Sequence, residues 1–148
     1  MLGRAGVIWS AIMLAAILNG AARDLFLMPR FGDPIARAVS SLTLAALILL
    51  VTWISLPWIK PASMGDAWWI GALWMTMTLA FEFGAGHYVF HTPWKELVAD
   101  YNILAGRLWI LVLVSTFISP ALVEHFRRNQ WPIHGNRSRA TRTRSPNN

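Results

Sequence analysis

Four long apolar segments constrain the fold of this chain more than any other feature of its sequence. They cover about residues 5–22, 38–59, 67–90 and 103–123, and the shortest holds 18 residues. At a helical rise of about 1.5 Å per residue, even that segment reaches roughly 27 Å, close to the thickness of a bilayer core. We therefore predict an all-α fold, a four-helix transmembrane bundle. A chain that is 55% hydrophobic and only 14% charged fits the same class.

The composition changes abruptly after the fourth segment. Residues 125–148 carry few apolar side chains, and six of the 13 lysines and arginines of the chain fall in its last 22 residues. We predict a membrane domain over residues 1–124 and a disordered basic C-terminal tail over 125–148. Because arginine-rich flanks are retained in the cytoplasm, both termini are expected there. The tail lacks interleaved aromatic residues, so we do not expect nucleic acid as a partner.

The first segment has two interpretations. A basic residue, an apolar core and small residues in series are also the pattern of a cleaved secretory signal. A seam of small and polar residues at four-residue spacing instead favours a membrane helix that packs on a neighbour. The members of this seam are Ala11, Ala15, Asn19 and Arg23. We expect a retained first span.

The connector from Arg23 to Arg37 is too apolar for an ordinary solvated loop. We expect it to lie in the headgroup layer with its helix broken by Pro29, Gly32 and Pro34. Arg30 and Arg37 are predicted to contact anionic headgroups there. At the other end of the second segment, we expect Pro57 and Pro61 to end the helix.

Helical spacing places small and polar residues on one face of each of two segments. On the second segment they are Ala38, Ser41, Ala45, Thr52 and Ser55. On the third segment they are Gly71, Met75, Thr78, Glu82 and Gly86. Such faces are typical of contacts between membrane helices, so we expect both to be turned toward neighbouring helices.

Two ionisable residues, Glu82 and Arg107, lie inside the third and fourth segments. Each costs about 2.5–3.5 kcal/mol within a bilayer, so such residues are rare and usually face a partner or a water-filled cavity. An antiparallel hairpin of these segments would bring both to similar depth, and we predict an intramembrane ion pair. A supporting polar network is expected from Asn19, Arg23, Asp100, Tyr101 and Asn102.

Three functions remain open from these residues. The first is a structural, accessory or interaction subunit held by the Glu82–Arg107 pair. The second is a small proton- or cation-coupled transporter that uses Glu82. The third is a membrane metal enzyme, because His87 and His91 are spaced to share a metal on one helix face.

Other catalytic patterns do not occur in the sequence. It has no cysteine, no glycine-rich phosphate loop and no G-x-S-x-G motif. We therefore expect a protein without a cofactor and favour a role other than catalysis. The expected partners are the lipid bilayer and either further copies of the chain or a larger membrane complex.

Five short motifs are spread over residues 19–114. They are N-G-x-x-R-D from Asn19, P-R-x-G from Pro29, E-F-x-x-G-H-Y from Glu82, W-x-x-L-x-x-D-Y-N from Trp94 and G-R-L-W-x-L-V-L from Gly106. Together these motifs resemble a family of small bacterial four-span integral membrane proteins with no assigned activity. The resemblance implies a location in the bacterial inner membrane. It also implies importance for Glu82, Asp100, Tyr101, Asn102, Gly106 and Arg107.

Overall fold

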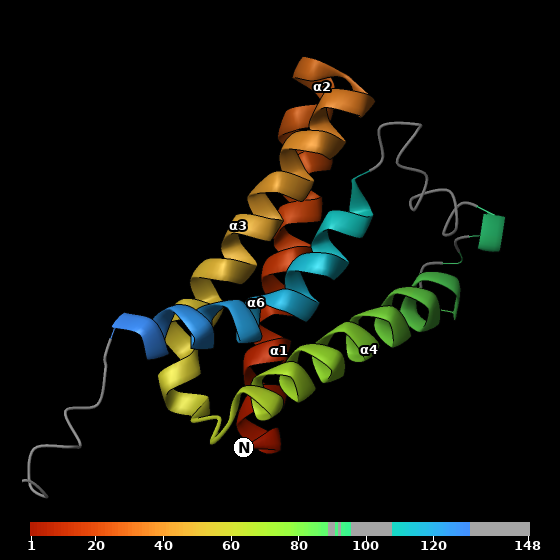
Figure 1. The fold of residues 1–148 in the computed structure, drawn as a ribbon. Coiled ribbons are helices and arrows are strands. Elements are labelled where there is room, and N and C mark those ends of the chain that lie inside the picture. Colours follow the sequence, from red (N-terminus) through yellow and green to blue (C-terminus); the bar gives the residue numbers. More distant parts are fainter. Residues whose placement is uncertain (89–90, 92, 96–107, 131–148) are drawn as a thin grey trace, which may run out of the picture.

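The computed structural model describes residues 1–88, 91, 93–95 and 108–130, and every regular element in these ranges is helical (Figure 1). Four long helices dominate. They are α1 (Leu2–Ala22), α3 (Asp33–Ile59), α4 (Met64–Tyr88) and α6 (Trp109–Gln130). Within the described ranges, three stretches are long and apolar enough to cross a membrane: Leu2–Phe31, Asp33–Ile59 and Trp109–Asn129. The prediction of a helical membrane protein is thus confirmed at this level.

The first helix continues well past its predicted end. A π-helical turn, η1 (Arg23–Leu27), and a short helix, α2 (Met28–Phe31), extend α1 without a break. The expectation that Pro29 breaks the helix here was wrong. Pro29 lies in the first turn of α2, directly after the wide π turn, where a missing N–H is tolerated. The chain reverses only at Gly32, whose φ of 77° favours glycine.

The second predicted span is longer than its apolar stretch. Helix α3 begins at Asp33 rather than at residue 38, with a proline in its first turn, and it runs through Pro57 to Ile59. An acidic residue in the first turn complements the helix dipole, and proline is compatible with that position. Pro57 therefore does not end the helix, which stops where Lys60 adopts a left-handed conformation.

Helix α4 starts earlier than its apolar residues indicate because a cap orders the turn before it. The carboxylate of Asp66 accepts hydrogen bonds from the backbone N–H groups of Ala62 and Ser63, at 2.9 and 3.0 Å. The hydroxyl of Ser63 accepts in return from the N–H of Asp66 at 3.1 Å. This reciprocal capping box places the first helical residue at Met64.

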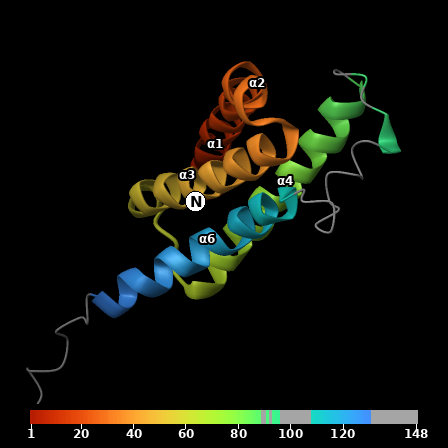
Figure 2. The same ribbon diagram turned by 90° about the horizontal axis from the view of Figure 1, so that it is seen from above.

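The core lies toward the end of the bundle where α3 ends and α4 begins. Helix α6 packs on both α3 and α4, and α1 packs mainly on α3 (Figures 1 and 2). The largest fully buried side chains include Trp74, Leu44, Ile48, Leu56 and Ile70. The apolar window of α1 is only 11% buried, against 44% for α3 and 39% for α6, so α1 is peripheral.

Four of the five residues on the predicted face of α3 are buried, and the fifth, Ala38, is half-buried. Ser41, Ala45, Thr52 and Ser55 are all shielded from solvent. Thr52 donates a hydrogen bond to the hydroxyl of Ser119 on α6 at 3.1 Å. Small polar side chains therefore allow α3 and α6 to approach closely, as the spacing predicted.

The expected end of the membrane domain lies inside a helix. Helix α6 continues six residues past Glu124, through residues 125–130, which were predicted to be disordered. Arg128 pairs with Glu124 one turn earlier at 2.7 Å, and this i, i+4 pair supports the last turns. The predicted tail over residues 131–148 and the start of the fourth span over residues 103–107 lie outside the described residues.

Candidate functional site

Glu82 joins α4 to α6 through an indole. One carboxylate oxygen of Glu82, Oε2, accepts a hydrogen bond from Nε1 of Trp109 at 2.7 Å. Both side chains are half-buried. The short distance is typical of a charge-assisted bond, and these are stronger than bonds between neutral groups. The carboxylate is thus held at the interface of the two helices.

The stripe that carries Glu82 faces neighbouring helices, as predicted. Gly71 lies so close to α6 that a Cβ placed on it would be 2.0 Å from the carbonyl oxygen of Phe117. Thr78 is buried and accepts a hydrogen bond from Nε1 of Trp9 on α1 at 3.1 Å. The stripe therefore contacts α6 at Gly71 and Glu82, and α1 at Thr78.

Among the residues that the structure describes, three tryptophans donate hydrogen bonds across helix interfaces, and the sequence reasoning missed this role. Besides Trp9 and Trp109, the completely buried Trp74 donates from Nε1 to the carbonyl of Ala5 at 2.9 Å. The indole N–H needs a partner when it is shielded from water, and two of these bonds join α1 to α4 while the third joins α6 to α4. The available signal was the position of Trp74, three residues after Gly71 and four before Thr78, on the buried face.

The predicted partner of Glu82 cannot be compared with the structure. Arg107 lies outside the described residues, as do Asp100, Tyr101 and Asn102. Trp109 follows Arg107 by two residues in the sequence. The Glu82–Arg107 pair therefore stays a prediction.

Asn19 contacts α3, and Arg23 contacts its neighbour in the chain. The side-chain amide of Asn19 donates to the carbonyl and to the hydroxyl of Ser40 on α3, at 3.0 and 2.7 Å. Arg23 pairs with the adjacent Asp24 at 2.8 Å. Asn19 therefore serves the contact between α1 and α3, the helix against which α1 packs most, whereas Ala11 of the predicted seam is exposed.

The helical geometry expected for a shared metal does not form. Helix α4 ends at Tyr88, and His91 lies beyond it with a φ of 52° and an exposed side chain. The two histidines are thus not one turn apart on a helix. The ring of His87 instead stacks on Trp94, with centroids 4.2 Å apart. No group of three potential metal ligands occurs among the residues that the structure describes.

Arg30 and Arg37 lie near the Gly32 reversal. Arg37 forms an ion pair with Asp33 one turn earlier at 2.8 Å, and Arg30 is exposed on α2. The Arg37–Asp33 pair stabilises the first turn of α3. Headgroup contacts by these arginines stay a prediction.

The opposite end of the bundle carries a cluster of four basic side chains. This basic end consists of Arg4, Lys60, Arg127 and Arg128. Pro57 has no N–H, so the carbonyl of Trp53 lacks its helical partner, and Arg127 donates to that carbonyl at 3.2 Å.

Two further arginine contacts bring the remaining helices to this end. Arg4 donates to the carbonyl of Trp58 at 2.9 Å, and Arg128 donates to that of Ala62 at 3.3 Å. The basic end therefore gathers the start of α1, the end of α3, the turn before α4 and the end of α6. Comparison of the chain with protein-family models, curated protein sequences and solved structures finds no match.

Proposed function

We propose that this chain is a four-span integral protein of a bacterial cytoplasmic membrane that acts as a structural, accessory or interaction subunit. Its spans are α1, α3, α4 and α6, and the basic end lies at the cytoplasmic surface with both termini. The polar residues within its helices serve to hold the helices together. The observation that carries the proposal is the Glu82–Trp109 hydrogen bond between α4 and α6.

The length and packing of α4 support a fourth span. Its 25 residues extend about 37 Å at the usual helical rise, enough to cross a bilayer. Three tryptophans and Glu82 lower its mean hydropathy. However, Trp74 and Thr78 are buried with hydrogen-bond partners on α1, and Glu82 bonds to α6. Paired polar groups of this kind are tolerated in membrane helices.

The distribution of charge supports the orientation. Positively charged residues favour the cytoplasmic side, and four of them form the basic end. Several exposed tryptophans, including Trp58 and Trp69, lie beside it, as is usual at the border between lipid and water. Reporter fusions placed after residue 130 and in the stretch 89–107 test this orientation. The proposal requires a cytoplasmic signal from the first and an external one from the second.

Substitution of Glu82 tests the structural role. Glu82→Ala removes the acceptor of the Trp109 N–H, and a buried donor without a partner costs about 1–3 kcal/mol. We expect a lower melting temperature in mild detergent and normal targeting to the membrane. Asp24→Ala is the matched control, because Asp24 is an exposed carboxylate in η1, away from the α4–α6 interface.

A charge swap tests the proposed partner of Glu82. The double variant Glu82→Arg with Arg107→Glu should recover part of the stability that either single variant loses. An unchanged melting temperature in Glu82→Ala would contradict the structural role. Proton-driven uptake in proteoliposomes that disappears in a fully stable Glu82→Gln variant would favour a carrier instead. Native mass spectrometry would report self-association and co-purifying subunits.

A further inference from the structure

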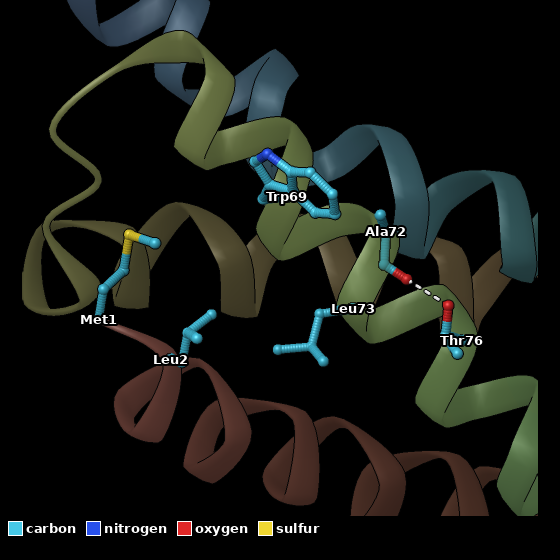
Figure 3. Close-up of a pocket in the computed structure, with 6 residues that line it drawn as sticks. All are labelled: Met1, Leu2, Trp69, Ala72, Leu73 and Thr76. Atoms are coloured by element: carbon cyan, nitrogen blue, oxygen red, sulfur yellow. Dashed lines mark hydrogen bonds between the residues drawn. The ribbon is translucent and has the colours of Figure 1, made fainter.

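An apolar groove opens between the start of α1 and the first turns of α4. Figure 3 shows the side chains that line it, and its volume is about 540 Å³. The lining residues are Met1, Leu2, Trp69, Ala72, Leu73 and Thr76. The hydroxyl of Thr76 donates to the carbonyl of Ala72 at 2.8 Å, so the polar side chain in this lining already has a partner. The groove therefore offers almost only hydrocarbon surface to whatever occupies it.

The groove begins beside the basic end. Met1 and Leu2 line it, and Arg4 lies in the first turn of α1, where it donates a hydrogen bond to the end of α3. Lys60 follows directly on α3 and is exposed. From Trp69 to Thr76 the groove follows α4 for seven residues, or about 10 Å, away from this end.

The basic end has a surplus of positive charge that its own carboxylates do not neutralise. Asp66 accepts from two backbone N–H groups, and Glu124 pairs with Arg128. Among the residues that the structure describes, no carboxylate lies within ion-pair distance of Arg4 or Lys60. Arg4 uses one N–H on the carbonyl of Trp58, and a guanidinium has five. Donors thus remain for an anionic ligand.

We propose that the groove and the basic end together bind one anionic phospholipid. One acyl chain lies along the groove, and the phosphate is held by Lys60 and Arg4. This inference rests on the proposed function in one respect, namely that the basic end lies at a membrane surface. Phosphate suits both side chains, since lysine and arginine bind it through charge-assisted hydrogen bonds.

Charge complementarity favours this lipid over a second copy of the chain. Two copies packed through the groove side by side in one membrane would bring two basic ends together, and like charges at an interface oppose association. An anionic headgroup has the opposite effect. A zwitterionic lipid would fill the groove equally well but would gain less from Lys60 and Arg4. Selectivity for the anionic headgroup is therefore the distinguishing property.

Native mass spectrometry of the full chain in mild detergent tests the proposal. The protein is titrated with phosphatidylglycerol and, separately, with phosphatidylcholine of the same acyl chains. We expect one tightly held phosphatidylglycerol per chain. Lys60→Gln should weaken its binding about fivefold, the change that corresponds to about 1 kcal/mol per basic residue near an anionic membrane surface. Binding of phosphatidylcholine, whose choline group offsets the charge of its phosphate, should weaken less.

Matched variants separate the site from general lipid adhesion. Lys95→Gln removes the same charge from an exposed lysine outside the basic end and should leave binding unchanged. Ala72→Leu adds bulk within the groove and should reduce binding of both lipids. Ala80→Leu adds the same bulk at an exposed position of α4 outside the groove and should not. Melting temperatures confirm that each variant is folded.

Three results would overturn the lipid site. These are equal affinity for the two lipids, equal effects of Lys60→Gln and Lys95→Gln, or a lipid-free dimer whose formation Ala72→Leu abolishes. None of them concerns membrane insertion itself. A failure of the proposed four-span topology would appear instead in the reporter fusions, so the two failures can be told apart.

Discussion

Among the glycines whose surroundings the structure describes, Gly71 is the position where an added methyl group should disturb the packing most directly. A Cβ at this residue would lie 2.0 Å from the carbonyl oxygen and 2.9 Å from the carbonyl carbon of Phe117 on α6. Both atoms belong to the backbone and cannot rotate away. Ordinary contacts of a Cβ are longer than 3.0 Å, so in Gly71→Ala the two helices must separate by about 1 Å.

The cost of this separation can be worked out approximately. A gap of about 0.5–1 Å forfeits a quarter to a half of the dispersion energy of each contact that it opens. Overpacking of this kind typically costs about 1–3 kcal/mol. Replacing a helical glycine by alanine stabilises the helix by up to about 1 kcal/mol, because alanine has the higher helix propensity. We therefore expect Gly71→Ala to lower the free energy of unfolding by about 1–2 kcal/mol. This corresponds to a melting temperature about 2–8 °C lower for a chain of this size.

Thermal unfolding in detergent, followed by circular dichroism, measures this effect, and α4 supplies its own control. A Cβ at Gly84 would meet no atom within 4 Å, so Gly84→Ala has the same gain in propensity without the clash. We expect the melting temperature of Gly84→Ala to equal that of the wild type or to exceed it. If Gly71→Ala melted at the same temperature as Gly84→Ala, α4 and α6 would not cross at Gly71, and the arrangement of the stripe would be refuted.

Three further predictions use the same measurement. Trp109→Phe removes the donor to Glu82 and should cost about 1–3 kcal/mol, since a carboxylate at the helix interface loses a hydrogen bond; an unchanged melting temperature would contradict this. Asn19→Ala should cost about 1–2 kcal/mol through loss of the α1–α3 hydrogen bonds, and equal stability would show that they contribute nothing. Arg127→Gln should destabilise the wild type more than it destabilises the Pro57→Ala variant. An alanine at position 57 supplies the N–H that the carbonyl of Trp53 otherwise lacks, so this carbonyl no longer needs Arg127. Additive losses in the double variant would refute this coupling.

The helix faces could be predicted from the sequence with good accuracy. Gly71, Thr78 and Glu82 face neighbours, and so do Thr52 and Ser55 of α3, as their spacing indicated. This succeeded because helical period and residue size are local properties, and membrane helices pack through small and polar residues. The chain alone therefore indicated which side of α3 and of α4 is buried.

The helix ends were harder to predict because the helices extend beyond the apolar stretches of the sequence. Helix α1 extends through Pro29 by means of a π turn, and α4 begins at a capping box before its apolar residues. Helix α6 adds its last turns with the Glu124–Arg128 pair. In each case local hydrogen bonding, rather than hydropathy, decides where the helix begins or ends.

What only the tertiary structure decided is the choice of partners. The sequence showed that Asn19 and Glu82 need partners, but a polar side chain does not encode which neighbouring helix will supply one. Because α1 packs on α3, Asn19 forms its hydrogen bond with Ser40. Because α6 packs on α4, Glu82 accepts its hydrogen bond from Trp109. These pairings depend on contacts between residues far apart in the chain, whereas hydropathy and residue spacing describe only a local stretch of sequence.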